Sequence, residues 1–159
     1  GRPGAGLYEP GLGDRAGVAS TVKAINQLLT GSHIALTAEA LALGIRAGAD
    51  PKELVEVIMS SAGRSHQFET KAGRMLAGDE ERKSSFGIFR KDLDIAMDAA
   101  SEAGLDLPVA AAARALFARA SDEGWAQRSE TMMLRYYLDH ARRPQQETTA
   151  KKAQTSDER

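Results

Sequence analysis

The chain has 159 residues, of which 42% are hydrophobic, 27% are charged and 5% are aromatic, and its formal net charge is −1. This size and balance fit one domain with a substantial hydrophobic core. The near-neutral charge argues against nucleic acid or a membrane surface as the main partner. Because the sequence has no cysteine, it offers no disulfide, thiol nucleophile or thiolate metal site. The first residues do not show the charged-then-apolar layout of a signal peptide, and no apolar run approaches the length of a membrane span. We therefore expect a cytoplasmic protein.

A long proline-free stretch dominates the first third of the chain. After a glycine- and proline-rich lead-in at residues 1–13, residues 16–49 place apolar side chains at three- and four-residue steps, the spacing of a helix that buries one stripe. The expected stripe is Val18, Val22, Ile25, Leu29, Leu36, Ala40 and Leu43. With Asp14 as its N-cap, this helix would be about 45–50 Å long and would form a spine for shorter helices.

Five shorter helices are expected after the spine. Asp50 and Pro51 are typical of a helix start, and Ser65 and Gly78 are typical of a later start and end. The expected spans are 50–60, 65–78, 85–104, 106–124 and 129–141. Since no persuasive strand is present, the predicted fold is all-α, with one long central helix and about five shorter helices packed on it. The helical domain would cover residues 14–141, and the polar residues 142–159 would form a disordered tail.

The best candidate site is a polar face on the long helix. Lys23, Asn26, Gln27 and Thr30 lie at three- and four-residue offsets, so they share one side of the helix. From these residues alone, an ordinary solvated helix face is the alternative. His33 and His140 have no acidic or histidine partner at metal-ligand spacing, so we assign no metal.

Several segments, taken in order, resemble the helical C-terminal domain of the β-hydroxyacid dehydrogenase family. The first is the run GVASTVKAINQLL, and the others are residues 38–40, 48–51, 61–65, 88–93 and 107–108. The family includes 3-hydroxyisobutyrate, tartronate semialdehyde and L-threonate dehydrogenases, and residues 84–89 are most similar to the L-threonate branch. The resemblance covers residues 13–138 and implies a fold like the C-terminal domain of 6-phosphogluconate dehydrogenase.

The resemblance also implies a function. It implies the C-terminal substrate and dimerisation domain of an NAD(P)-dependent oxidoreductase that transfers hydride from a small β-hydroxy or sugar acid to the nicotinamide. Lys23 matches the family's catalytic acid/base lysine, Asn26 and Gln27 match its substrate-binding positions, and Lys91 matches the lysine that reaches the bound NAD or NADP. Many members have asparagine at both substrate-binding positions, so Gln27 is a departure. The resemblance further implies a homodimer, and a nucleotide-binding domain that this sequence lacks.

Each of these assignments has a plainer alternative. The chain as a whole would then be a non-catalytic helical dimerisation or interaction module. Lys91 and Asp92 would form a surface pair, with Asp92 capping or pairing structurally. His66 stands where the family usually has tryptophan, and it would either line the site or be a lone exposed histidine.

Overall fold

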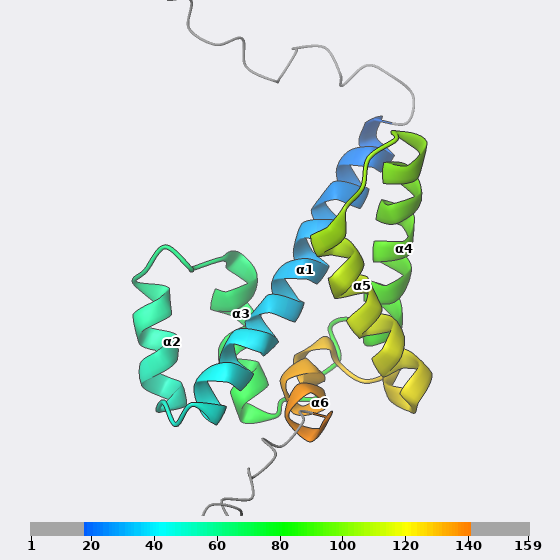
Figure 1. Cartoon of the computed structure of the whole chain (residues 1–159). Helices are drawn as coiled ribbons and strands as arrows, with labels where there is room; N and C mark the ends of the chain where they lie inside the picture. Colours follow the sequence, from blue (N-terminus) through cyan, green and yellow to red (C-terminus); the bar gives the residue numbers. More distant parts are fainter. Residues whose placement is uncertain (1–17, 141–159) are drawn as a thin grey trace, which may run out of the picture.

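A computed structural model describes residues 18–140, and these residues form a helical fold (Figure 1). The α-helices are α1 (Val18–Arg46), α2 (Pro51–Met59), α3 (His66–Ala77), α4 (Phe86–Glu102), α5 (Pro108–Ala120) and α6 (Met133–His140). A π-helical segment, Ser121–Trp125, follows α5, and a 3₁₀ turn, Glu130–Met132, precedes α6. Within residues 18–140 the β-type pairing is one isolated bridge between Ser85 and Ser129. The predicted all-α class is therefore confirmed, whereas the expected lead-in, the Asp14 cap and the tail lie outside the described residues.

Helix α1 is the spine of the fold. Its 29 residues correspond to about 43 Å at 1.5 Å per residue. Helices α4 and α5 lie along its N-terminal half, whereas α2 and α3 lie on the other side near its C-terminal end, with α6 close by (Figure 1). The spine ends at Arg46 instead of reaching residue 49, and Gly48 then adopts a φ of 86°.

The predicted helix starts are confirmed by hydrogen bonds. The Asp50 carboxylate accepts from the backbone N–H groups of Lys52 and Glu53 at 2.9 and 3.0 Å. The Ser65 hydroxyl accepts from the backbone N–H of Phe68 at 3.1 Å. These bonds satisfy donors that the first turn of a helix leaves unpaired, so a local sequence signal is enough to locate them.

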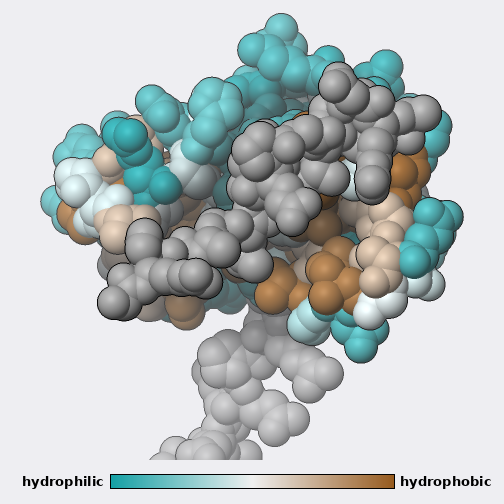
Figure 2. All heavy atoms as spheres, turned by 90° about the horizontal axis from the view of Figure 1, so that it is seen from above, coloured by the Kyte–Doolittle hydropathy of each residue, from teal (hydrophilic) through white to brown (hydrophobic). Residues whose placement is uncertain are grey.

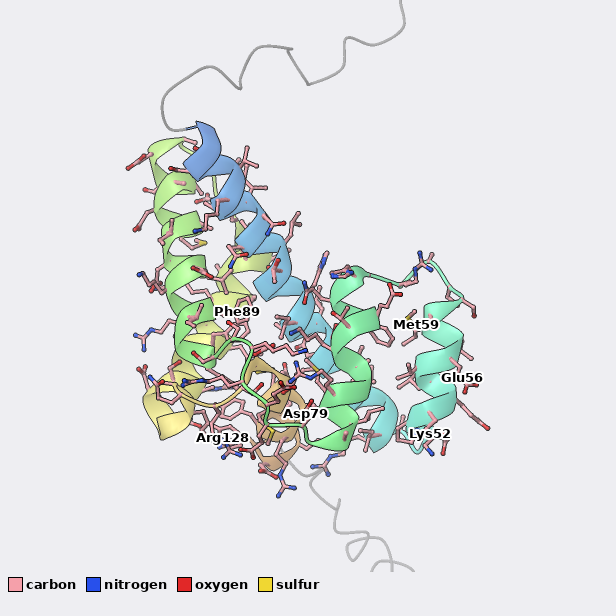
Figure 3. All side chains as sticks on the ribbon, turned by 180° about the vertical axis from the view of Figure 1, so that it is seen from behind. Lys52, Glu56, Met59, Asp79, Phe89 and Arg128 are labelled. Atoms are coloured by element: carbon pink, nitrogen blue, oxygen red, sulfur yellow. The ribbon has the colours of Figure 1, made fainter. Side chains whose placement is uncertain are left out.

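The core lies around α1, which packs against α3, α4, α5 and α6. Phe86, Phe117 and Tyr136 are fully buried, and the Phe86 ring packs against Phe117 and Tyr136 with centroids 5.8 and 6.3 Å apart. Phe89 enters the same region from the first turns of α4 (Figure 3). Met132 and Met133 are buried as well, as expected for core residues.

The expected buried stripe on α1 is wrong. Side chains of Val22, Ile25, Leu29, Leu36 and Leu43 are between 49 and 72% exposed, and the Val18 side chain lies outside the description. The opposite face, which is rich in alanine, packs inward instead. Its buried residues include Ala24, Ile34, Ala38 and Leu41. Small residues let neighbouring helices approach α1 closely, and a three- and four-residue pattern identifies an apolar face without showing what covers it.

Other large apolar side chains also reach the surface. On α4, Ile88 and Ile95 are about half exposed, and on α5 Val109 is 66% exposed. Seen from above, hydrophobic residues come to the surface between hydrophilic ones (Figure 2). Helix α2 has no fully buried residue, and Met59 packs only partly against the core while Lys52 and Glu56 lie along the outer helix (Figure 3).

Helix α1 is also long and apolar enough to qualify as a candidate membrane span. The segment Ser20–Arg46 meets that test by length and composition, contrary to the sequence-based expectation, and 44% of its most apolar window is buried inside the fold. Core helices of soluble proteins pass the same test, and α1 contacts every other helix. Packing within this fold therefore accounts for the buried part of this helix, and the exposed aliphatic side chains are the remainder.

Candidate active site

Lys23 lies on the exposed side of the N-terminal half of α1. Its side chain is open to solvent, and within residues 18–140 it forms no ion pair. Asn26 is exposed one turn later, and Gln27 and Thr30 are half-buried. The Thr30 hydroxyl donates to the backbone carbonyl of Asn26 at 2.8 Å. The predicted polar face therefore exists, beside the exposed apolar side chains of α1.

Gln27 connects this face to α4. Its Nε2 donates to Asp92 Oδ2 at 2.6 Å, and its Oε1 accepts from Asn26 Nδ2 at 3.3 Å. Gln27 and Asp92 are half-buried, so the shorter bond is partly shielded from water. Asp92 is thus part of the candidate site, although the sequence suggested it only as a cap or a structural pair.

Lys91 lies beside Asp92 on α4 and is exposed. Ile88 and Ile95, at three and four residues on either side of it, are exposed as well, so they share its face of the helix. The structure brings Asn26, Gln27 and Asp92 together. It places Lys23 and Lys91 on the two packed helices α1 and α4, with no direct bond between them.

A cavity of about 340 Å³ opens next to the polar face. Thr30 of α1 and Phe89 of α4 contribute to its wall, and the exposed His66 lines it too. Its remaining charged lining residues are Lys71, Arg74, Lys83 and Glu130. Lysine, arginine and hydroxyl groups around one opening suit an anionic or hydroxylated small molecule.

Glu130 lines this cavity and binds other residues of its wall. Its side chain is fully buried, pairs with Lys71 Nζ, and accepts from the backbone N–H of Ser84 at 3.1 Å. Arg74 Nη1 lies 3.9 Å from the same carboxylate. No sequence signal identifies this cluster, because Lys71 and Ser84 are 59 and 46 residues away from Glu130 in the chain.

Arg74 also secures the loop after α3. Its Nε donates to Asp79 Oδ2 at 2.7 Å, and this bond, with the backbone N–H of Glu81, holds the pKa of the Asp79 carboxyl below its ordinary value. Asp79 and Arg128 lie at this end of the molecule (Figure 3). The loop is largely exposed, but these bonds fix its position.

His140 has structural surroundings. His140 stacks on the Tyr136 ring, with centroids 4.2 Å apart, and its Nε2 lies 3.2 Å from Glu123. Within the described part of the chain, no group of three or more histidine or acidic side chains is arranged to hold a metal ion.

The chain matches, over residues 17–137, the family described as "NAD-binding of NADP-dependent 3-hydroxyisobutyrate dehydrogenase". It belongs to this family. The resemblance deduced from the sequence motifs is therefore confirmed. The matched region contains Lys23, Asn26, Gln27 and Lys91, and it coincides with almost all of the described helical fold.

Individual relatives in the family agree with this assignment. The chain is 43% identical over 126 residues to an L-threonate dehydrogenase of Cupriavidus necator and 36% identical to one of Escherichia coli K12. In both comparisons the match covers 79% of this chain and 42% of the relative. The chain therefore spans less than half the length of the curated relatives that it matches.

Solved structures show the same relationship. The crystal structure of a 3-hydroxyisobutyrate dehydrogenase from Salmonella typhimurium matches with a TM-score of 0.74 and 37% identity, over 77% of this chain and 43% of that one. A Mycobacterium tuberculosis 3-hydroxyisobutyrate dehydrogenase, at 22% identity and a TM-score of 0.69, shares the fold. The helical architecture is thus that of one part of a larger family protein.

Proposed function

We propose that this chain is the helical domain that supplies the proton-transfer lysine of an NAD(P)-dependent dehydrogenase acting on a small β-hydroxy or sugar acid. The observation that carries the proposal is the exposed Lys23 on α1, with Asn26 and Gln27 one turn away, in a chain of this family. A reactive group that is open to solvent in the helical domain alone is expected where a second domain completes the site.

In this mechanism Lys23 moves the proton. As the carbon–hydrogen bond of the alcohol breaks, hydride leaves with its electron pair and the hydroxyl proton passes to the neutral Lys23 amine, which leaves a carbonyl group. In the reverse direction the Lys23 ammonium returns the proton to the carbonyl oxygen. Covering the amine with another domain would favour its neutral form, because desolvation disfavours charge.

The residues of this chain fit one edge of a dinucleotide. Lys91 offers an exposed ammonium that forms no ion pair within residues 18–140, which suits a phosphate or a ribose edge. NAD or NADP, when bound, supplies the hydride acceptor. Asn26 and Gln27 provide amide groups that orient the substrate beside Lys23.

Two partners are proposed for the exposed apolar residues of α1. A nucleotide-binding domain would cover the part near Lys23, and a second copy of the chain would cover the remainder, giving a homodimer. Contiguous exposed aliphatic side chains commonly mark such interfaces. The proposal also places the protein in the cytoplasm, where its hydroxy-acid substrate and cofactor would be available.

Turnover by a completed enzyme tests the function. The chain is joined to the part of the Cupriavidus necator L-threonate dehydrogenase that it does not match, and reduction of NAD and NADP is followed with L-threonate and other small hydroxy acids. We expect turnover with at least one acid and none from the chain alone. A joined protein that folds and binds cofactor but oxidises no hydroxy acid would contradict the proposal and favour the non-catalytic dimerisation module.

A further inference from the structure

Two hydrogen bonds in series lead from the α1–α4 interface to the surface beside Lys23. The first runs from Gln27 Nε2 to Asp92 Oδ2 at 2.6 Å, and the second from Asn26 Nδ2 to Gln27 Oε1 at 3.3 Å. Along this series, exposure increases from the half-buried Asp92 and Gln27 to the exposed Asn26. The inner end is thus anchored by packing, and the outer end is free to meet a ligand.

The Asp92 carboxylate determines the orientation of the Gln27 side-chain amide and, through it, that of Asn26. An ionised carboxylate only accepts hydrogen bonds, whereas an amide side chain has one donor end and one acceptor end of similar shape. Gln27 must therefore turn its Nε2 toward Asp92, which directs its Oε1 outward. That oxygen in turn selects the Nδ2 of Asn26, so the Asn26 Oδ1 is left as an acceptor.

We propose that Asp92 is a positioning residue that, through Gln27, fixes the Asn26 Oδ1 as a hydrogen-bond acceptor beside Lys23. Asn26 is three residues after Lys23, on the same side of α1. An acceptor at this point fits a substrate that carries a second hydroxyl next to the reacting one, because a hydroxyl donates a hydrogen bond and a methylene does not. The inference rests on the proposed dehydrogenase function and narrows its substrates to vicinal dihydroxy acids.

A purely structural role for Asp92 predicts different behaviour. If the Gln27–Asp92 bond only tied α1 to α4, losing it would reduce stability and would affect all substrates alike. A positioning role instead predicts a change in discrimination between a vicinal dihydroxy acid and its deoxy analogue. Sites built to bind a substrate hydroxyl reject analogues that lack it, since their own polar groups are then left unpaired.

The test uses the joined enzyme described above, with L-threonate and the analogue that lacks the neighbouring hydroxyl. In Asp92→Asn the carboxylate becomes an amide that supports either orientation of Gln27. We expect the ratio of kcat/KM values for the two acids to fall about tenfold, the worth of one hydrogen bond, with little change in Tm. Asp94→Asn is the matched control, because Asp94 lies on the same helix and pairs with Arg114 at the surface.

A double variant distinguishes positioning from general damage. In Gln27→Glu with Asp92→Asn, the new carboxylate at position 27 accepts from the new amide at position 92 and from Asn26 Nδ2, so the Asn26 orientation is restored. We expect the discrimination to recover toward that of the unmodified enzyme. Unchanged discrimination in Asp92→Asn, or no recovery in the double variant, would overturn the proposal.

A readout independent of turnover separates this inference from the proposed function. In NMR spectra of the chain, the Gln27 side-chain amide protons should exchange slowly with solvent, and Asp92→Asn should reduce that protection, because only one of the two Gln27 orientations then donates to residue 92. Protected Gln27 signals in a joined protein without turnover would refute the dehydrogenase function but support the hydrogen-bond series. Gln27 protons that exchange as fast as those of an exposed glutamine would overturn the series itself.

Discussion

The two ends of the fold differ in how completely their side chains are covered. At one end, the buried Glu130 carboxylate pairs with Lys71 and lies near Arg74, and Arg74 in turn pairs with Asp79. Along the N-terminal half of α1, the aliphatic side chains of Val22, Ile25 and Leu29 are about half exposed, and Lys23 forms no ion pair with any of residues 18–140. The first end is complete within this chain, whereas the second has the features of a surface that another domain completes.

The largest expected effect comes from removing the charge of Glu130. Glu130→Gln removes the charge that compensates Lys71 and Arg74, so we expect a loss of about 3–5 kcal/mol in the free energy of unfolding, measured by urea denaturation. Glu80→Gln serves as the control, because Glu80 pairs with Arg128 at the surface and such pairs contribute about 0–1 kcal/mol. Equal losses in the two variants would show that the Glu130 cluster is not a stabilising unit.

Substitutions of two isoleucines on α1 allow its covered and uncovered faces to be compared directly. Ile34 is fully buried and Ile25 is 52% exposed. In the chain alone, Ile34→Ala should cost about 2–5 kcal/mol by leaving a cavity, whereas Ile25→Ala should change stability by about 0.5 kcal/mol or less. In the joined enzyme the cost of Ile25→Ala should rise, since the added domain covers that side chain. No increase there would mean that the exposed face stays uncovered.

The smallest expected effect concerns Tyr137, which lies on α6 and donates to the Glu39 carboxylate on α1. Burial, helped by this bond, raises the pKa of Tyr137 from 10.0 to about 12. A raised pKa in the folded state stabilises the fold below the ordinary value, and this stabilisation is lost as the pH rises from about 10 to about 12.

Absorbance of ionised tyrosine against pH tests this assignment. Burial also raises the pKa of Tyr136, so the unmodified chain should show two tyrosines that ionise late, and Tyr137→Phe should remove one of these two steps while lowering stability near neutral pH by about 1 kcal/mol or less. If Tyr137→Phe leaves both late steps in place, neither belongs to Tyr137, and the contact between α6 and α1 is weaker than the structure indicates.

Sequence reasoning succeeded where the interactions are local. The caps at Asp50 and Ser65 depend on residues two or three positions away, and the shared face of Lys23, Asn26 and Gln27 follows from helix geometry alone. It failed where burial or a contact depends on residues that are far apart in the sequence. The spacing of Leu29 and Leu43 shows that α1 has an apolar face, but only the packing of the other helices decides which face is buried.

In the candidate site, too, the sequence did not predict the contacts between residues that are far apart in the chain. Gln27 and Asp92 are 65 residues apart, and Lys71 and Ser84 are 59 and 46 residues from Glu130, so no local pattern predicts these contacts. From the sequence, Asp92 was expected only to cap a helix or to pair structurally. Three-dimensional placement is what makes Asp92 part of the candidate site.

The most direct test of the central claim is the turnover of Lys23→Ala in the joined enzyme, with Lys52→Ala as the control for loss of an exposed lysine on another helix. Positioned acid–base groups contribute about 10²–10⁴-fold to rate. The account predicts that Lys23→Ala lowers kcat by such a factor while Tm is preserved, and that Lys52→Ala keeps nearly full activity. Turnover of Lys23→Ala within a few-fold of the unmodified enzyme would contradict it.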